Sequence, residues 1–306
     1  MTRMHRRHFL AGVSGAAAAA LWPCWLAAQR GRTRLVLLGT GGGPRPRKAN
    51  SASAQVIVID GAAYVIDCGD GVARQLAFAG VPLPTLRHIF LTHQHSDHTA
   101  DYGNLIWLAW AAGLRTRVDT WGPPPLEKMT RLFFEMNAAD IDTRIADEGR
   151  VPLAPLVHVH ELTAAGLVFQ DEHVKVTSAL VRHPPVVPAF GYRFDAVDRS
   201  IVISGDTAPS DELIALARGA DVLVHEALYL PAAPGEPGSA LRQHVVDSHT
   251  PVEEAGRIAA EAGVKTLVLS HFVPAENPPI TDDQWLAGAR THFSGRIVVG
   301  RDLLEL

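Results

Sequence analysis

Apolar residues occur along the chain in short runs that glycine, proline and acidic residues interrupt. Continuous or alternating apolar runs predict strands, and apolar positions repeating every three or four residues predict helices. The turn residue Gly61, between two such runs, is typical of a β-hairpin. In the first half, strands are predicted at 33–38, 55–60, 63–67 and 88–92, and helices at 71–79 and 105–110.

The second half of the chain shows the same alternation of strands and helices. Strands are predicted at 174–181, 190–194, 201–204, 222–224, 266–269 and 296–299, and helices at 211–218, 251–262 and 282–292. The helix over 251–262 places its apolar residues on one stripe, from Val252 to Ala262. No linker or break in composition divides the chain, so residues 29–306 are predicted to form one α/β domain.

Polar residues fall at particular places in this pattern. His93, Asp206, His225 and His271 each follow an apolar run, at the predicted end of a strand. Loops at one edge of a rigid sheet are where binding and catalytic sites are usually built. The pattern therefore predicts a site at this edge.

The strongest chemical signal is the cluster His93, His95, Asp97 and His98, which follows directly on an apolar strand. Imidazole nitrogens and carboxylate oxygens are ligands that zinc prefers. In an extended turn, residues two apart point the same way, so His93 and His95 can chelate one ion. The next turn directs Asp97 and His98 toward a second ion.

Four ligands in one loop cannot close two metal sites, so further ligands are needed from elsewhere in the chain. His183 ends a strand before two prolines, and Asp206 and His271 each lie at a predicted strand end. A lone histidine is more often structural than a ligand. In a chain that already carries the cluster, these three are the predicted partners.

The overall charge bears on the possible partners of the protein, and the cysteine content on possible disulfides. The formal net charge is −4, and residues 1–28 contribute three arginines and no acid, so the remainder is more acidic still. An acidic protein lacks the basic surface that nucleic-acid phosphates require, so nucleic acid is an unlikely partner on this criterion. Cys68 is the only cysteine outside residues 1–28, which rules out an internal disulfide in the remainder.

The N-terminal residues 1–28 resemble a twin-arginine export signal. Arg6 and Arg7 precede Phe9 and Leu10, and an alanine-rich apolar run follows. We expect cleavage of this signal peptide and a periplasmic or secreted protein without stable membrane insertion. The alternative is an uncleaved anchor, because the apolar run approaches the ~20 residues that span a membrane.

The motif His-x-His-x-Asp-His at residues 93–98 resembles the signature of the metallo-β-lactamase superfamily, and the resemblance extends over the mature chain. Within the superfamily, the order of further motifs is similar to the ribonuclease Z and arylsulfatase-like branch. These motifs are residues 38–41, 191–193, 204–207, 225–227, 249–250 and 269–272. The resemblance implies a four-layer αββα sandwich and, since the branch often dimerises, a homodimer.

The resemblance also implies which residues hold which metal. His93, His95 and His183 are expected to bind the first ion, Asp97, His98 and His271 the second, and Asp206 both. Two zinc ions are expected, although manganese or iron also suits such ligands. Zinc β-lactamases use a thiolate where this chain has Asp206, which argues against lactamase activity.

The expected chemistry is hydrolysis without a protein nucleophile. Two zinc ions about 3.5–4 Å apart lower the pKa of a shared water toward ~7 and so supply hydroxide at neutral pH. Asp97 is expected to direct that hydroxide. By resemblance to paired family motifs, His249 is the expected general acid and Glu226 the residue that orients it. The alternative for His249 is a structural role next to the N-terminus of the helix over 251–262.

Asp67 also matches a position of the superfamily, and its carboxylate is expected to accept hydrogen bonds from loop amides.

The expected substrate is a small phosphodiester or an aryl sulfate ester, cleaved by an exported enzyme. Ribonuclease Z enzymes that process tRNA carry a long arm between the residues matching His183 and Asp206, and here that interval fits only a hairpin. The family pattern expected after His271 is also missing. Alternatives are a tRNA 3′ endonuclease, a lactone or carboxylic ester hydrolase, and a non-catalytic metal-binding protein. Residues 115–157 are expected to form the pocket rim.

Overall fold

A computed structural model describes residues 33–276 and 279–306. The predicted signal peptide over residues 1–28 lies outside the described residues, so its export function stays a prediction. Among the residues that are described, no helix is long and apolar enough to cross a membrane.

Thirteen strands in the described part of the chain form two sheets, one of six strands and one of seven. The first has the order β1-β2-β3-β4-β5-β6, with bounds β1 Thr33–Gly39, β2 Ala54–Ile59, β3 Ala62–Ile66, β4 Leu86–Phe90, β5 Val118–Gly122 and β6 Val157–Glu161. The second has the order β13-β12-β11-β10-β9-β8-β7, with bounds β7 Gly166–Gln170, β8 Val174–Leu180, β9 Phe190–Ala196, β10 Ser200–Ile203, β11 Val222–Leu228, β12 Thr266–Val273 and β13 Arg296–Val299.

The two sheets pack face to face around a hydrophobic core. Alternation along β1 shows the principle, because successive side chains of a strand point to opposite faces. Leu35 and Leu37 enter the core between the sheets, whereas Val36 and Leu38 face the helices outside. From β9, Phe190, Tyr192 and Phe194 also enter the space between the sheets.

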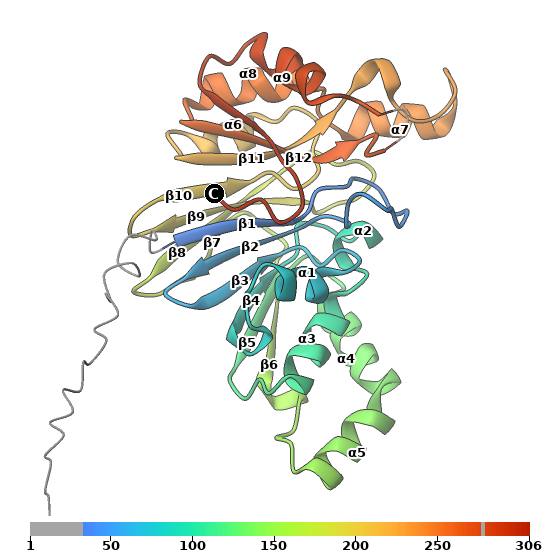
Figure 1. The fold of residues 1–306 in the computed structure, drawn as a ribbon, viewed down its shortest axis with the longest axis vertical. Helices are drawn as coiled ribbons and strands as arrows, with labels where there is room; N and C mark the ends of the chain where they lie inside the picture. Colours follow the sequence, from blue (N-terminus) through green and yellow to red (C-terminus); the bar gives the residue numbers. More distant parts are fainter. Residues whose placement is uncertain (1–32, 277–278) are drawn as a thin grey trace, which may run out of the picture. The chain divides into compact units, whose positions relative to one another are not determined.

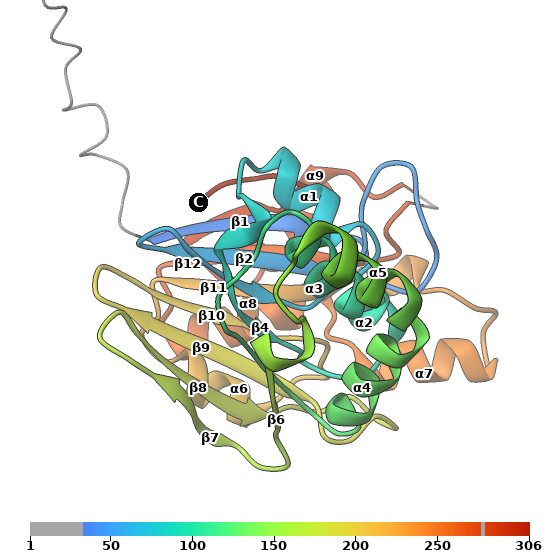
Figure 2. The same ribbon diagram turned by 90° about the horizontal axis from the view of Figure 1, so that it is seen from below.

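Helices cover the outer face of each sheet, so four layers stack from top to bottom of Figure 1. Helices α1 (Val72–Phe78) and α3 (Tyr102–Ala111) share a core with the first sheet. Helices α6 (Asp211–Ala217), α8 (Val252–Ala262) and α9 (Asp282–Arg290) share a core with the second. The predicted αββα sandwich is therefore confirmed. Figure 2, seen from below, shows the antiparallel strands β7, β8 and β9 side by side at one end of the second sheet.

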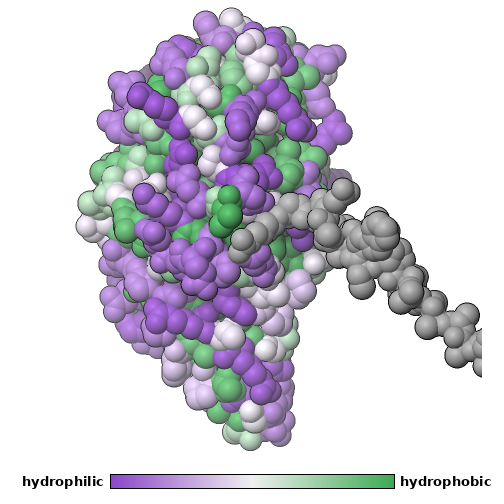
Figure 3. All heavy atoms as spheres, turned by 90° about the vertical axis from the view of Figure 1, so that its left-hand side faces the viewer, coloured by the Kyte–Doolittle hydropathy of each residue, from purple (hydrophilic) through white to green (hydrophobic). Residues whose placement is uncertain are grey.

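Four further helices and three short 3-10 turns were not predicted. The helices are α2 (Ser96–Thr99), α4 (Leu126–Met136), α5 (Ala138–Glu148) and α7 (Ala240–Ser248). The 3-10 turns are Leu83–Thr85, Ala154–Leu156 and Leu230–Ala232. Figure 3 shows a surface on which hydrophilic residues predominate and apolar residues are scattered, as is usual for a protein surface.

Strands β11 and β12 run further than the sequence pattern predicts. The apolar runs end at 224 and 269, but β11 continues to Leu228 and β12 to Val273. Glu226 pairs with Ser270, and the next pair is Ala227 with Phe272, so His271 is the extra residue of a β-bulge. The expectation that His225 and His271 follow the strand ends was therefore wrong: both lie inside strands.

Candidate metal centre

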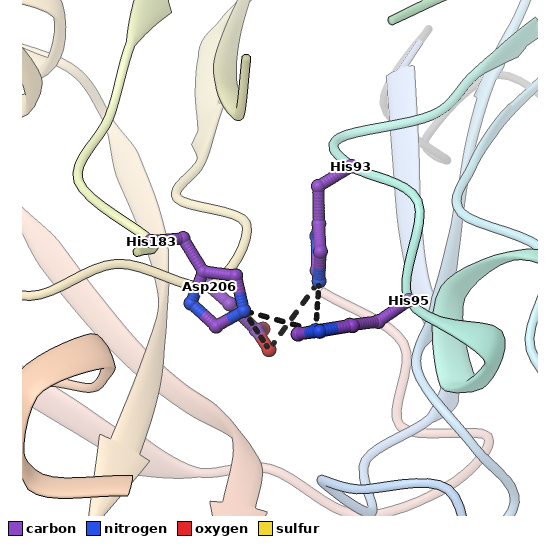
Figure 4. A group of neighbouring side chains, drawn as sticks. All are labelled: His93, His95, His183 and Asp206. Atoms are coloured by element: carbon purple, nitrogen blue, oxygen red, sulfur yellow. Dashed lines mark hydrogen bonds and ion pairs between the residues drawn. The ribbon is translucent and has the colours of Figure 1, made fainter. Parts of the chain in front are cut away.

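The predicted ligand residues meet where several loops leave the two sheets. His93 and His95 come from the segment between β4 and α2, His183 from the connection between β8 and β9, and Asp206 from the turn after β10. Figure 4 shows His93, His95, His183 and Asp206 pointing toward one another from these separate segments. Loops from both sheets thus build one site.

Glycine is required in the turn that carries Asp206. Gly205 has a φ of +60°, a conformation that side chains rarely adopt. A Cβ at this position would lie 2.8 Å from the carbonyl oxygen of Phe190 and 2.9 Å from Cβ of Thr92. The close approach brings Asp206 next to the segment that follows Thr92.

The first group of ligand atoms consists of His93 Nε2, His95 Nδ1, His183 Nε2 and Asp206 Oδ2. His95 Nδ1 lies 3.1 Å from His93 Nε2 and 3.0 Å from His183 Nε2. Asp206 Oδ2 lies 3.8 Å from His93 Nε2 and 3.9 Å from His183 Nε2. Tetrahedral zinc with bonds of about 2.0–2.1 Å has ligand atoms roughly 3.3 Å apart, so these four atoms fit such an ion.

The second group consists of Asp97 Oδ2, His98 Nε2, His271 Nε2 and Asp206 Oδ1. His271 Nε2 lies 3.3 Å from Asp97 Oδ2 and 3.2 Å from Asp206 Oδ1. His98 Nε2 lies 3.7 Å from Asp97 Oδ2 and 3.3 Å from Asp206 Oδ1. The two oxygens of Asp206 therefore face different groups, which is the arrangement of a carboxylate that bridges two cations.

Two buried atoms of the second ligand group have no hydrogen-bond partner among the described residues. His98 Nε2 and Asp206 Oδ1 are buried, and the described residues supply neither with a hydrogen-bond partner. Buried polar atoms without partners are rare in proteins. A metal ion between the two atoms would satisfy both of them.

Neighbouring groups fix the orientation of three histidine rings. Nδ1 of His93 lies 3.0 Å from Thr92 Oγ1, Nδ1 of His98 lies 2.7 Å from Asp67 Oδ2, and Nδ1 of His183 lies 2.9 Å from the carbonyl oxygen of Ser248. Such partners hold the ring so that Nε2 faces the metal. Asp67 also accepts a 2.8 Å bond from the amide of Thr92, as the sequence predicts for its interaction with loop amides.

Burial keeps the first-group histidines in the neutral form that a metal binds. Burial lowers the pKa of His93 well below its usual range and that of His183 to about 4. The pKa of Asp206 is also lowered, but by neighbouring charges and against the effect of burial. Burial works to raise its pKa, but the nearby His271 and His98 hold it well below its usual range, so this carboxylate stays ionised.

His249 and Glu226 form a buried pair beside the ligands. His249 Nδ1 lies 2.9 Å from Glu226 Oε2, and the other oxygen of Glu226 accepts a 2.7 Å bond from the amide of Thr207. Burial works to lower the pKa of His249, but Glu226 and Asp206 raise it to about 9. The imidazole is therefore a proton donor at neutral pH. His225 Nδ1, in contrast, lies 2.7 Å from the carbonyl oxygen of Glu226, and the described residues offer its Nε2 no hydrogen-bond partner.

A cavity of about 690 Å³ opens over the site. His95, Asp97 and His249 lie among its lining residues, together with apolar side chains such as Val245 and Val273. The lining contains no residue from 115–157, so the prediction that this segment forms the pocket rim was wrong. Its helices α4 and α5 instead follow β5 at the side of the first sheet.

Two features of the site were not predicted from the sequence. The amide of Gly43 donates a 2.7 Å hydrogen bond to Asp97 Oδ2, which draws the loop after β1 onto the site. The same loop brings Arg45 and Arg47 to the cavity. Helix α7 brings His244, which the sequence gave no reason to separate from ordinary surface histidines. Proline and glycine around residues 43–48 mark a loop but not its direction.

Comparison with known proteins agrees with this geometry. A family model described as a β-lactamase superfamily domain matches residues 63–272. The structure is similar to the metallo-β-lactamase fold protein YhfI from Bacillus subtilis, with a TM-score of 0.66, 22% identity and coverage of 90% of this chain and 98% of that one. Human tRNase Z, short form, gives a TM-score of 0.65 at 22% identity, with coverage of 89% and 98%. The protein is a metallo-hydrolase of the metallo-β-lactamase fold.

Sequence relatives define the branch. Ribonuclease Z of Mycobacterium bovis (strain BCG / Pasteur 1173P2) is 36% identical over 272 residues, which cover 88% of this chain and 96% of the relative. Ribonuclease Z of Mycobacterium sp. (strain KMS) is 37% identical over 271 residues, with coverage of 88% and 94%. The chain belongs to the ribonuclease Z branch of the metallo-β-lactamase superfamily.

These relatives overturn the expected function, an exported hydrolase of small phosphodiesters or aryl sulfates. The short interval between His183 and Asp206, now seen as β9 and β10, was the main argument against a ribonuclease. The matched relatives align over nearly their whole length, so the missing arm does not separate this chain from proteins called ribonuclease Z. Resemblance to arylsulfatase-like members therefore gave the wrong substrate class.

The expectation that nucleic acid is an unlikely partner was wrong for a related reason. Net charge is an average over the whole molecule, whereas phosphate binding depends on local charge. Arg45 and Arg47 line the cavity, and the next residue in this loop, Lys48, is exposed. The acidic chain thus places a basic segment beside its metal centre.

Proposed function

We propose that this protein is a metal-dependent ribonuclease of the ribonuclease Z type, which hydrolyses one phosphodiester bond near the 3′ end of a precursor tRNA. The observation that carries the proposal is the match to ribonuclease Z proteins over 88% of this chain and 96% of theirs. The basic segment Arg45–Lys48 at the cavity supports it, because phosphate contacts dominate the affinity of proteins for nucleic acid.

We propose that the two ligand groups hold two divalent ions, zinc in the first instance. His93, His95 and His183 would hold one, Asp97, His98 and His271 the other, and Asp206 would contact both. The donor set is entirely nitrogen and oxygen, so manganese or iron would also fit. When bound, such a pair of ions lowers the pKa of a water and offsets negative charge on the phosphate.

Asp97 is proposed to orient the attacking water. Burial works to raise the pKa of this carboxyl, but His98 and His271 hold it below its usual range, so Asp97 accepts hydrogen bonds at neutral pH. The amide of Gly43 and His271 Nε2 both contact Oδ2. These contacts fix the carboxylate at the cavity, where a water can donate to it.

His249 is proposed to protonate the leaving ribose oxygen. Its Nδ1 is bonded to Glu226, so Nε2 is the nitrogen that faces away from that carboxylate and can deliver a proton. As water attacks the phosphorus and gives up a proton to Asp97, the bond to the leaving oxygen breaks and that oxygen takes the proton from His249. Glu226 balances the charge on the imidazolium and holds its ring in place.

The test is cleavage of a precursor tRNA with a 3′ extension by the full chain loaded with zinc. We expect one cut that leaves a 3′-hydroxyl on the tRNA and a 5′-phosphate on the released fragment. Asp97→Asn should reduce the rate by at least about 10²-fold. A zinc-loaded protein that hydrolyses a nitrophenyl phosphodiester but leaves precursor tRNA uncut would overturn the proposed substrate.

A further inference from the structure

Helix α7 places one more histidine at the cavity, beyond the residues used so far. His244 lines the cavity, and its ring centroid lies 6.1 Å from that of His95, 6.1 Å from that of His183 and 6.4 Å from that of His249. It therefore lies beside both the first ligand group and the proposed general acid. None of the roles described above involves this side chain.

His244 is placed beside the metal groups but outside them. The groups of ligand atoms that lie within 4.8 Å of one another include His95, His183 and His249, and none includes His244. A direct role as a metal ligand is therefore not supported. As a lining residue of the cavity, His244 can instead be reached by a bound substrate.

The hydrogen bonds of α7 assign the tautomer of His244. Ser248, one turn later, donates its hydroxyl proton to the carbonyl oxygen of Pro184 at 2.5 Å, because a carbonyl oxygen only accepts. His244 Nδ1 lies 3.3 Å from the same hydroxyl oxygen, so in this contact Nδ1 must be the donor. In a neutral imidazole, the other nitrogen then carries a free lone pair.

In the neutral form of His244, Nε2 is thus the nitrogen that can accept a hydrogen bond from a ligand. His244 is half-buried and lines the cavity, and among the described residues no hydrogen bond to its Nε2 is present. A phosphate diester offers only acceptor oxygens and cannot donate to this nitrogen, whereas a hydroxyl group of the substrate can.

We propose that His244 Nε2 accepts a hydrogen bond from the ribose 2′-hydroxyl of the nucleotide next to the scissile phosphate, and so makes His244 a residue that selects RNA over DNA. This inference rests on the proposed function. The 2′-hydroxyl is the donor that a ribonucleotide carries beside its phosphate, and it is the group by which proteins distinguish RNA from DNA. Water is the nucleophile, so the 2′-hydroxyl takes no part in bond making.

The experiment compares two precursor tRNAs that differ only by a 2′-deoxy substitution at the nucleotide before the cut. We expect the wild-type protein to show a kcat/KM roughly fivefold higher for the all-ribose substrate, the effect of about one hydrogen bond. His244→Ala should lower kcat/KM for the all-ribose substrate and bring the ratio between the substrates close to one. Zinc content, measured by mass spectrometry, should stay at the wild-type value.

A matched variant on the same helix is Gln243→Ala, because Gln243 is exposed and its side-chain amide donates to Asp247 on the same helix. It should keep the wild-type ratio between the two substrates. Equal losses on both substrates in His244→Ala would overturn the inference, since a phosphate contact or a structural role has that effect. Cleavage of neither substrate by zinc-loaded wild-type protein would instead refute the proposed function itself.

Discussion

Glu226 Oε2 lies 2.9 Å from His249 Nδ1, and both side chains are buried beside the two ligand groups. Glu226 lies in β11, and His249 follows the last residue of α7. The pair therefore depends on the tertiary fold and not on closeness in sequence. A carboxylate that both orients a histidine and raises its pKa prepares it to donate a proton.

The first prediction concerns the leaving group. His249→Ala should slow cleavage of precursor tRNA by about 10²-fold or more, because a ribose oxygen is a poor leaving group without a proton. A nitrophenyl phosphodiester should be affected much less, since its leaving group is stable as an anion. Steady-state rates on both substrates check this, with His292→Ala as an exposed histidine control. Equal losses on the two substrates, or loss of zinc, would contradict the assignment.

The second prediction concerns pH. The pKa of His249 is raised to about 9, so the imidazole is protonated below that pH and loses its proton above it. Cleavage of precursor tRNA should therefore decline as the pH rises through about 9. The nitrophenyl substrate should lack this decline, and so should His249→Ala. A tRNA profile that stays level through pH 10 would count against His249 as the acid.

The third prediction concerns Asp67, which positions His98 through a 2.7 Å contact with Nδ1. Asp67→Asn should weaken zinc binding at the second group by about 10–100-fold, as is usual when the partner of a metal-binding histidine is lost. Competition with a chromogenic chelator measures this. Asp70→Asn is the control, because Asp70 is exposed in the same loop. Unchanged affinity in Asp67→Asn would contradict the proposed orienting role.

The fourth prediction concerns residues 1–28, interpreted from the sequence as an export signal. We expect protein isolated from its native cells to begin near residue 29. N-terminal sequencing of that protein decides the question, with Arg6→Lys combined with Arg7→Lys as a variant that should remain uncleaved. Recovery of the wild-type chain with Met1 intact would show that the segment is not removed.

The sequence predicted many of the strands and helices, and the cluster of candidate ligands, because those signals lie in short stretches of the chain. The cluster from His93 to His98 is contiguous, and it directly follows an apolar strand. The stripe on α8 is fully buried against the second sheet, as its helical spacing indicates. Periodicity and local spacing were sufficient for these parts, whereas the αββα arrangement and the division of the ligands between two ions came from the resemblance to the family.

Other parts depend on contacts between distant residues. The bulge at His271 arises from the register of β11 against β12, which no property of residues 266–273 alone reveals. Helix α7 has little segregation of apolar from polar positions, so its spacing gave no helical signal. Hence His244 could not be placed at the cavity. The substrate class was misjudged because net charge and loop length do not report the local arrangement of Arg45 and Arg47.

The central claim is that Asp206 joins two metal ions in one site. Anomalous diffraction from a crystal of the zinc-loaded protein, recorded on both sides of the zinc edge, tests it most directly. Two peaks about 3.5–4 Å apart are expected, one near each oxygen of Asp206. A single peak, or peaks away from His93, His183 and His271, would contradict it.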